Sequence, residues 1–567
     1  MIQVAGLSVP LSYDQEMLRR MVAERLHVGQ NRIGEIHLEK CSVDAANRAD
    51  IRFKVTVLAE LAGDESEILY SLKDKGITKA IQLIYAMPPE IRLNNRPVVV
   101  GCGPAGLFAA LILAQAGTRP VLLERGLDVD RRSRSVLAFW QTGILDACTN
   151  VQFGEGGAGA FSDGKLKIGK KDARKIKVLH ELVEAGAPPE ILYVAMPHVG
   201  TDRLRETVRH IREKIILLGG EVHFGATVMD ILRKDGQVHG VRYRTGKMTD
   251  PDPSSGQPAG PHSTACPAGN APDPDKQDVH ELSTDYVILA IGHSARDTFA
   301  RLYDSGIQME QKSFSLGVRI EHPQELIDKI RYGDFAGHPA LGAAAYKMVV
   351  HLKNGRNVYT FCMCPGGSVV SAASEENGLT TNGMSEHARD GRNANSALLV
   401  SIGRNDLGSD HPLEGIAFQR KMEAAAFAAG GGGYKAPVQR LEDFLHRRGT
   451  KSFGSVLPSY LPGTAFSEVE AYLPEDIADS LRQGILEMDE WMPGFADPDA
   501  ILTGAETRSS SPLRMTRGDT LEAVGIKGLY PCGEGAGYSG GIISAAVDGM
   551  LCAEQILKTR SGTHRRY

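Results

Sequence analysis

The residues Gly-Cys-Gly-Pro-Ala-Gly at 101–106 have the spacing of a turn that binds the phosphates of a dinucleotide. In such a turn Gly101 allows the chain to reverse tightly, and Gly103 lets backbone amides approach a pyrophosphate. Gly106 allows the next helix to pack closely on the preceding strand, and the N-terminus of that helix adds partial positive charge. We therefore expect the diphosphate of a dinucleotide to bind at this segment.

Regular elements in the right order surround this turn and make it specific. The β-branched run at 98–100 predicts a buried strand, and the apolar run at 107–116 predicts a helix. A second predicted strand at 120–124 ends in Glu124, which follows the first glycine by about the 20 residues expected of a carboxylate that binds a ribose hydroxyl. Strand, turn, helix, strand and acid together predict a dinucleotide site.

Three segments elsewhere in the chain favour FAD over NAD as the dinucleotide. Residues 155–165 form a glycine-dense loop in which backbone can come close to a large ligand. Residues 285–293 predict a buried strand ending in Ala-x-Gly, which resembles the strand-to-glycine turn of flavoproteins with two dinucleotide folds. Residues 528–546 predict a strand, an acidic glycine turn and a helix. Each segment also has an ordinary explanation, as a flexible loop, a core strand or a strand-to-helix turn.

The turn near the C-terminus resembles the flavin-binding turn of these flavoproteins. In them, an acid at the position of Glu534 binds the ribityl chain, and the next helix directs its N-terminus at the pyrimidine edge of the flavin. A helix N-terminus placed there stabilises the negative charge that reduction puts near the flavin N1 and O2 atoms. The usual acid is Asp, so Glu534 is a departure from the pattern.

Longer stretches are similar to the NAD(FAD)-utilizing dehydrogenase family of bacterial flavoproteins. They are FGEGGAGAFSDGKL, AIGHSARDTF, FSLGVRIEHP, TFCMCPGG, NGMSEHARDGRNANSALLV, GAETRSSSP and GLYPCGEGAGYSGGIISAAVDG. The resemblance covers nearly the whole chain and implies a Rossmann-like FAD-binding domain of the glutathione-reductase type with an inserted substrate domain. Together with the motifs it gives the expected FAD contacts: Gly101, Gly103, Pro104, Ala105, Gly106, Glu124, Arg125, Gly157, Ser162, Lys165, Gly292, Gly533, Glu534, Gly541 and Ile542.

Cys362 and Cys364 end a predicted strand at 357–363 and are followed by Pro-Gly-Gly. In a regular strand the two side chains share a face but lie about 6.6 Å apart, beyond the Cβ separation of about 4 Å in a disulfide. Only a kink would bring them together, and Pro-Gly-Gly could supply one. A redox or covalent role and plain packing are both open for this pair. Metal ligation is disfavoured because no second thiol pair accompanies it, so we expect no metal site.

Three other side chains are candidates for binding the substrate or for transferring a proton to it. His293 follows the Ala-x-Gly turn directly and could face the flavin and transfer a proton. Glu506 and Arg508 lie in Gly-Ala-Glu-Thr-Arg and could orient an acidic or polar substrate. The ordinary alternatives are a hydrogen-bonded histidine and a structural ion pair between Glu506 and Arg508.

Length, charge and cysteine content exclude several classes of protein. The 567 residues exceed what one hydrophobic core normally organises, and the formal charge of -5 gives no electrostatic footprint for nucleic acid. The chain starts without a basic and apolar leader, and no apolar run approaches the roughly 20 residues that span a bilayer. Eight scattered cysteines are typical of reduced thiols. We therefore expect a cytoplasmic protein whose partner is a small molecule rather than a membrane.

The order of the predicted elements divides this α/β chain into domains. Residues 1–91 predict a small N-terminal α+β domain, and residues 96–304 and 501–567 supply the two parts of the FAD-binding domain. Residues 305–500 predict an inserted substrate domain of mixed α+β type. Within the FAD-binding domain, 249–276 is rich in proline and lacks Val, Ile, Leu and Phe, which predicts a surface insertion.

Hydrophobic periodicity predicts the main elements outside the FAD motifs. The expected helices are at 15–26, 77–85, 414–428 and 474–491, and the expected strands are at 33–43, 51–61, 238–244, 344–352 and 357–363.

These expectations support one leading hypothesis and two alternatives. The leading one is an FAD-dependent oxidoreductase, a dehydrogenase in which FAD exchanges hydride with a small organic substrate enclosed between the FAD domain and the inserted domain. No second complete strand, glycine turn and helix follows, so NAD(P)H is expected at most as a transient electron donor. The alternatives are a flavoprotein that acts on or binds RNA, which the acidic balance counts against, and a non-catalytic flavin-binding redox sensor that uses Cys362 and Cys364.

Overall fold

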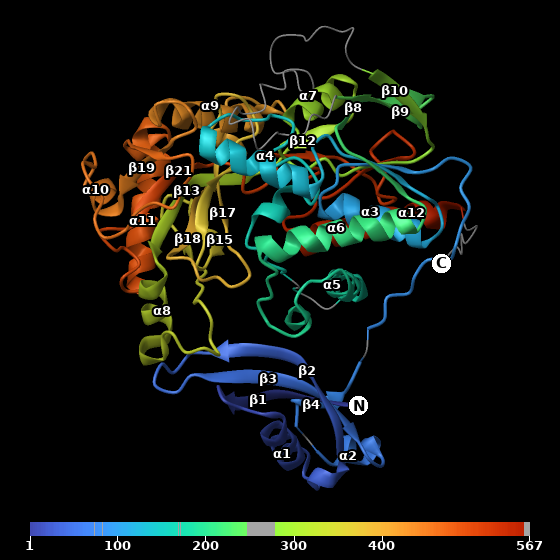
Figure 1. Cartoon of the computed structure of the whole chain (residues 1–567), viewed down its shortest axis with the longest axis vertical. Helices are drawn as coiled ribbons and strands as arrows, with labels where there is room; N and C mark the ends of the chain where they lie inside the picture. Colours follow the sequence, from blue (N-terminus) through green and yellow to red (C-terminus); the bar gives the residue numbers. More distant parts are fainter. Residues whose placement is uncertain (73, 82, 168, 170–171, 247–277, 561–567) are drawn as a thin grey trace.

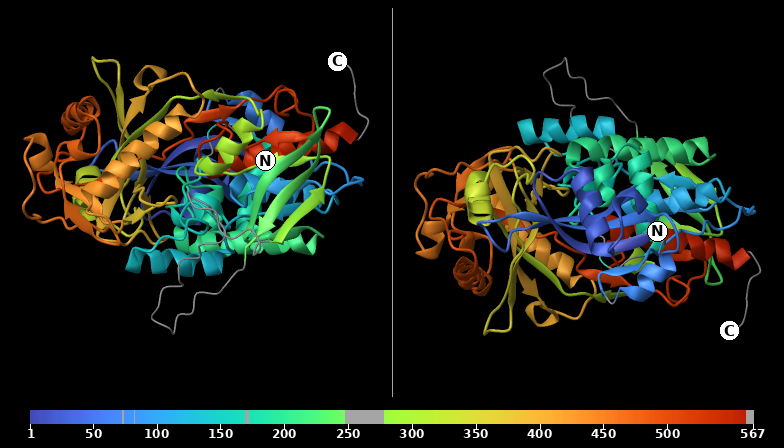
Figure 2. Two further views of the ribbon diagram at one scale, coloured as in Figure 1. Left: turned by 90° about the horizontal axis from the view of Figure 1, so that it is seen from above. Right: turned by 90° about the horizontal axis from the view of Figure 1, so that it is seen from below.

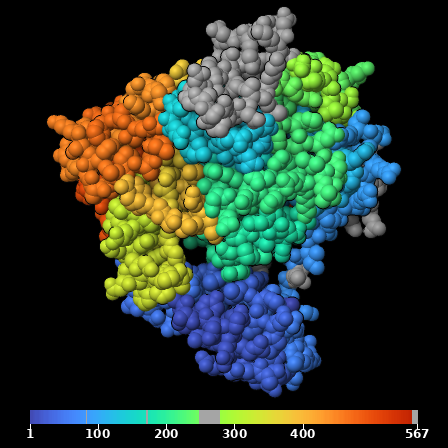
Figure 3. All heavy atoms as spheres, viewed as in Figure 1, coloured from blue at the N-terminus to red at the C-terminus, as the bar shows by residue number. Residues whose placement is uncertain are grey.

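The computed structural model describes residues 1–72, 74–81, 83–167, 169, 172–246 and 278–560 (Figure 1). The insertion expected at 249–276 lies outside the described residues. The described chain contains a four-stranded N-terminal sheet, a five-stranded parallel sheet, a seven-stranded sheet and three smaller sheets. The five- and seven-stranded sheets lie side by side (Figure 2), and the N-terminal unit forms one end of the molecule, in blue in Figure 3.

The N-terminal sheet has the strand order β2-β3-β1-β4 and is covered on one face by two helices (Figure 1). Leu18 and Val22 of the first helix share one buried core with Val57 of the sheet. The backbone amide of Cys41 in β2 donates to the carbonyl of Tyr193, which joins this unit to the rest of the chain. The elements are β1 (Ile2–Pro10), α1 (Gln15–Leu26), β2 (Ile33–Asp44), β3 (Arg52–Leu61), α2 (Glu65–Ser71) and β4 (Ile77–Lys79).

The helix expected at 77–85 is wrong. Residues Ile77–Lys79 form the short strand β4, which pairs antiparallel with β1. The pairing buries Ile77, which is 6% exposed, whereas Ile81 and Ile84 are 79% and 76% exposed. Strand pairing gives Ile77 a place in the N-terminal core, and this tertiary gain outweighs the local helical pattern.

Neighbouring strands of the five-stranded sheet are all parallel. The order in space is β23-β11-β5-β6-β7, so the direction of winding reverses between β5 and β11. Doubly wound sheets bind their ligands at such a reversal, beyond the carboxyl ends of the strands. The first and last predicted glycine turns follow β5 and β23 and therefore lie at this edge. The strands are β5 (Val98–Val100), β6 (Val121–Leu123), β7 (Glu221–His223), β11 (Val287–Leu289) and β23 (Leu529–Pro531).

Helices α3 (Pro104–Gln115) and α12 (Ile542–Arg560) pack side by side on one face of this sheet, although one lies early and the other late in the chain (Figure 1). A Cβ atom on Gly549 of α12 would lie 2.0 Å from the carbonyl oxygen of Ala105, so only glycine permits this approach. Helix α3 is apolar on all sides because the sheet, α12 and α6 (Thr201–Leu217) surround it.

The other face of the parallel sheet carries a second layer. Val98 and Val100 of β5 point into this layer, while Val99 points toward α3 and α12, as the alternation of a strand requires. The layer contains a three-stranded antiparallel sheet and a short helix. Its elements are β8 (Ala226–Lys234), β9 (Gln237–Thr245), β10 (Asp278–Ser283) and α7 (Arg296–Asp304).

The seven-stranded sheet has the order β14-β15-β18-β13-β21-β19-β20, and helices α9 and α11 pack on it. Strand β21 pairs with β13 and then leads the chain back to the parallel sheet. The elements are β13 (Phe314–Pro323), α8 (Gln324–Tyr332), β14 (Val349–His351), β15 (Asn357–Cys364), β18 (Asn393–Ile402), α9 (Glu414–Ala429), β19 (Ala436–Arg440), β20 (Thr464–Phe466), α11 (Glu475–Trp491) and β21 (Ile501–Glu506).

The strand expected at 344–352 is only partly correct, because β14 begins at Val349. The amide of Ala344 donates to the side chain of Asp328 at 2.8 Å, and the amide of Met348 donates to Thr360 Oγ1 at 2.8 Å. These side chains satisfy backbone amides that a strand would have paired with a neighbour.

Among the helices that the structure describes, none is both long and apolar enough to cross a bilayer.

Candidate functional site

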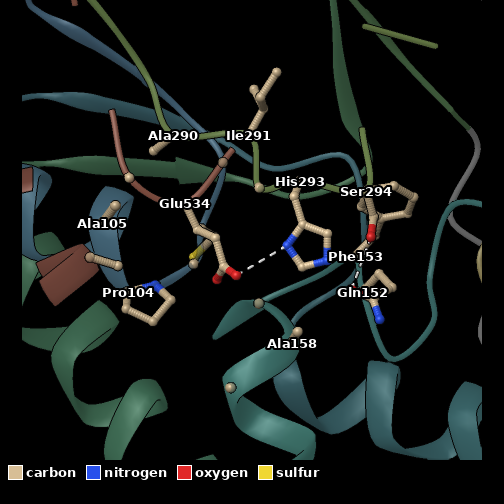
Figure 4. A pocket seen from close by; sticks show the side chains of 18 of the residues that line it. Pro104, Ala105, Gln152, Phe153, Ala158, Ala290, Ile291, His293, Ser294 and Glu534 are labelled. Carbon is tan, nitrogen blue, oxygen red and sulfur yellow. Dashed lines mark hydrogen bonds and ion pairs between the residues drawn. The ribbon is translucent and has the colours of Figure 1, made fainter. Parts of the chain in front are cut away.

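One cavity of about 300 Å³ opens beyond the carboxyl ends of the parallel strands. Segments far apart in sequence line it: the turn at 101–105, the glycine loop at 152–159, the turn at 289–294 and the late segment at 532–545. Figure 4 shows several of these side chains around the opening. On the side of the seven-stranded sheet, the lining consists of Phe361, Cys362, Asn382, Glu506, Arg508 and Ser509.

The turn after β5 is shaped so that only glycine fits at two positions. A Cβ atom on Gly101, whose φ is 102°, would lie 2.3 Å from the carbonyl oxygen of Ala290. A Cβ atom on Gly106 would lie 1.8 Å from the carbonyl oxygen of Gly101. Helix α3 begins at Pro104, so its N-terminus opens on the cavity and its free amides can bind an anionic group there.

Glu124 stands at the end of β6 and holds two glycine segments together. Its carboxylate accepts hydrogen bonds from the amides of Cys102 at 2.7 Å, Gly126 at 2.9 Å and Gly154 at 3.0 Å. An ionised carboxylate has about four acceptor positions, so one is left for a ribose hydroxyl. Glu124 therefore shapes the turn as well as lining the cavity.

We expect Glu124→Gln to weaken FAD binding about tenfold or more, because the amide has one oxygen in place of two acceptors for three backbone amides. Fluorescence titration of the apoprotein with FAD measures the change. Glu221→Gln is the matched control, since Glu221 lies at the start of β7 and is exposed. An unchanged FAD dissociation constant in Glu124→Gln would contradict the assignment.

Buried charges anchor the glycine loop that faces this turn. The guanidinium of Arg132 is buried and donates to the carbonyl oxygens of Asn150, Val151, Gly154 and Glu155. Burial lowers the pKa of Arg132 to about 10, which keeps it charged at neutral pH. The loop is therefore held by four hydrogen bonds from one side chain, a role that the sequence did not indicate.

The end of the same loop directs two further predicted contacts into the cavity. Ser162 Oγ donates to the carbonyl of Gly159 at 2.8 Å. Lys165 Nζ lies 3.5 Å from the carboxylate of Asp163, which is itself held by a bidentate pair with Arg389. Lys165 is thus a fixed cation in the cavity wall.

The late glycine turn is fixed by an ion pair beneath it. Asp548 accepts the amide of Gly533 at 2.7 Å and pairs with Arg517 at 2.7 Å. A Cβ on Gly540 or Gly541 would meet nothing within 4 Å, so both face open space, and the first turn of α12 lines the cavity. The cavity therefore receives the N-termini of both α3 and α12.

His293 points into the cavity, and the partners of its two ring nitrogens indicate whether a ligand fits there. Its Nδ1 lies 3.5 Å from the carboxylate of Glu534 (Figure 4). Its Nε2 is buried and has no hydrogen-bond partner among the described residues. A buried nitrogen without a partner is costly, and a ligand in the cavity would supply one. The glycine turns and this nitrogen fit a large dinucleotide.

The ordinary alternative for Glu506 and Arg508, a structural ion pair between the two, is wrong, because each pairs with a residue from another element. Arg319 of β13 donates to Glu506 at 2.9 and 3.1 Å. Arg508 donates to Glu423 of α9 at 2.8 and 3.0 Å, and Arg296 donates to the same carboxylate at 2.7 and 2.8 Å. Sequence analysis did not predict Glu423, Arg296 and Arg319 as site residues, because no local sequence pattern indicates that they lie near the cavity.

The structure brings nearly all the predicted site residues to one cavity. Every expected FAD contact lines it except Gly106, which packs beneath the turn, and every candidate reactive residue lines it except Cys364, which lies behind Cys362.

Family models match two parts of the chain. Residues 313–509 match the family described as FAD-dependent protein, C-terminal domain-like. Residues 1–60 match a domain of unknown function (DUF8436).

The chain is similar to a curated protein in sequence and, at low identity, to several solved structures. A Clostridium beijerinckii protein, described as an uncharacterized protein, is 44% identical over 564 residues, covering 98% of both chains. The flavin-dependent brominase Bmp2 is 11% identical with a TM-score of 0.36, covering 83% of this chain and 80% of that chain. A flavoprotein/dehydrogenase from Cytophaga hutchinsonii is 9% identical with a TM-score of 0.35, covering 83% and 79%.

Proposed function

The chain belongs to the family of its full-length clostridial relative, an FAD-dependent flavoprotein family, and we propose that it is an oxidoreductase acting on a small polar organic molecule. FAD is its cofactor. The main support for the proposal is the common cavity, which is lined by glycine turns from two distant parts of the chain and by polar side chains on the side of the seven-stranded sheet. When bound, FAD supplies two-electron chemistry by hydride exchange with the substrate.

We also propose that the FAD-binding part of the chain has a fold of the glutathione-reductase type. The strand order of the parallel sheet supports this assignment. In this proposal, residues 96–304 and 501–567 form the FAD domain and 305–500 the substrate domain, with a separate N-terminal domain at 1–91. The turn at 101–106 would hold the diphosphate, and the N-terminus of α12 would stabilise negative charge on the reduced ring.

The substrate side of the cavity carries two lysine side chains, Lys165 and Lys167. Lys167 lines it with its Nζ 5.1 Å from the ring centre of Phe361, and Lys165 lies nearby. Glu506 is neutralised by Arg319. An anionic group such as a carboxylate would therefore bind favourably beside Asn382 and the two lysines.

His293 would hold or move a proton at Nε2. Its other ring nitrogen faces Glu534, and a carboxylate in that position orients an imidazole. The unpartnered Nε2 is then available to the ligand.

Anaerobic photoreduction of the flavin in the holoprotein tests the proposal. We expect at least one compound from a set of small organic acids to reoxidise the flavin, or to reduce the oxidised form, and neutral analogues to react more weakly. Lys167→Gln should raise the concentration needed for the half-maximal rate by about tenfold, which is the loss of one charge-assisted hydrogen bond.

Lys329→Gln is the control, because Lys329 lies on α8 in an exposed pair with Glu325. Addition of NADH or NADPH in the same assay tests whether a nicotinamide donates electrons. A purified protein that lacks flavin absorbance and takes up no added FAD would contradict the proposal.

Neither the cavity nor any comparison favours the alternative of a flavoprotein that acts on or binds RNA.

A further inference from the structure

A bulge in β15 brings the thiols of Cys362 and Cys364 together. The register of β15 on β18 shifts between Phe361 and Cys364, which places one extra residue on β15. Cys362 has a φ of 45°, a left-handed conformation that is rare for a residue with a side chain. The thiol of Cys364 donates to the carbonyl oxygen of Cys362 at 3.2 Å and also acts on the thiol of Cys362, whose pKa it lowers. The regular-strand geometry on which the expected separation was based therefore does not hold at this pair.

The two thiols differ in exposure and in pKa. Cys362 is half-buried and lines the cavity, whereas Cys364 is fully buried behind it. The hydrogen bond from Cys364 lowers the pKa of Cys362, and Lys165 and Arg319 lower it further against the effect of burial. The same hydrogen bond and burial raise the pKa of Cys364. Cys362 is therefore the thiol of the pair that loses its proton more readily.

The position of this pair sets it apart from the other described free cysteines. Cys102, Cys532 and Cys552 are fully buried, and burial raises the pKa of the first two. Cys41 lies in the N-terminal sheet, away from the cavity. Cys362 and its partner combine an accessible sulfur, a neighbouring cation and a strained backbone, which is the environment of reactive thiols.

We propose that Cys362 and Cys364 form a dithiol–disulfide couple that exchanges two electrons with FAD, and that the external partner is a small anionic disulfide or its thiol. The inference rests on the proposed function, because it requires FAD in the cavity. The cations Lys165 and Lys167, which line the cavity near the thiol of Cys362, favour a negatively charged partner.

The electrons and atoms balance in each step. The Cys362 thiolate attacks the substrate disulfide, and one substrate thiolate leaves. Cys364 then loses its proton and attacks the mixed disulfide at Cys362, so that the protein disulfide forms and the second substrate thiolate leaves. The protein disulfide would then take up two electrons and two protons from reduced FAD held in the cavity, which would restore both thiols. A two-electron donor such as a reduced nicotinamide would supply these electrons to the flavin.

Anaerobic reductive titration of the holoprotein tests the couple. After treatment with bis(carboxyethyl) disulfide and removal of the reagent, the wild type should take up about four electrons per FAD, and Cys362→Ser and Cys364→Ser about two. Peptide mass spectrometry after alkylation should show a link between Cys362 and Cys364 in the treated wild type and not in Cys362→Ser or Cys364→Ser. The neutral bis(hydroxyethyl) disulfide should form this link at least about tenfold more slowly.

Cys41→Ser is the control and should behave as the wild type in both measurements. The couple is overturned if the wild type and Cys362→Ser take up equal numbers of electrons and the linked peptide is absent. In that outcome a flavin that still exchanges electrons with other substrates leaves the proposed function standing. Loss of FAD from the wild type would instead remove the proposed function itself.

Discussion

Replacing Gly106 by alanine is expected to weaken FAD binding by about a hundredfold or more. The added Cβ would lie 1.8 Å from the carbonyl oxygen of Gly101, where backbone meets backbone and no rotamer change can relieve the contact. Helix α3 must then move away from β5, and its N-terminal amides leave the cavity. The absorbance of bound flavin after purification and the dissociation constant of added FAD measure the effect.

Two other glycine substitutions separate loss of the cofactor from loss of the fold. A Cβ on Gly518 meets nothing within 4 Å, and this residue does not line the cavity, so Gly518→Ala should bind FAD normally. Gly540 also has open space but lines the cavity, so Gly540→Ala should keep the thermal stability of the apoprotein while weakening FAD. Wild-type affinity in Gly106→Ala would show that the turn at 101–106 is not the diphosphate site.

The glycine turns could be predicted because their signal is local. A tight turn that approaches a phosphate requires glycines at fixed positions after a strand, so the residues around Gly101 and Gly533 carry the pattern within themselves. Their meeting at one cavity depends on long-range pairing, in which β11 lies between β5 and β23. The apolar strands predicted the buried sheet, and the order of the strands then determined where the turns lie.

The charged network could not be predicted, because its members are far apart in sequence. Glu423 lies 127 residues from Arg296 and 85 from Arg508. Nearness in sequence suggested a pair between Glu506 and Arg508, but neighbouring strands and helices supply closer partners. The bulge at Cys362 is a similar case, since its register is set by pairing with β18. Local patterns predict elements, whereas contacts between elements determine which charges meet.

Replacing Glu423 by glutamine is expected to destabilise the protein by about 3 kcal/mol or more. The carboxylate is buried between Arg296 and Arg508 and also accepts a hydrogen bond from Thr507 at 2.6 Å. Glutamine keeps the shape but removes the charge that the two buried guanidinium groups share, and Glu375 is then their remaining acidic partner among the described residues. Denaturant unfolding at neutral pH measures the loss. Glu325→Gln, which breaks an exposed pair on α8, should leave stability unchanged.

The pH dependence of the difference in stability between the wild type and Glu423→Gln gives a second measurement. Burial alone would raise the pKa of Glu423, but the guanidinium groups of Arg296 and Arg508 outweigh it and hold the pKa far below its ordinary value. A carboxyl whose pKa is lowered by folding stabilises the protein fully above its unfolded pKa of about 4.3, and that contribution is lost as the pH falls toward the folded value. The stability gap between wild type and Glu423→Gln should therefore stay constant from pH 8 to about pH 5 and shrink in more acidic solution. A gap no larger than that of Glu325→Gln, or one that widens in acid, would show that Glu423 is not the charge that balances the two arginines.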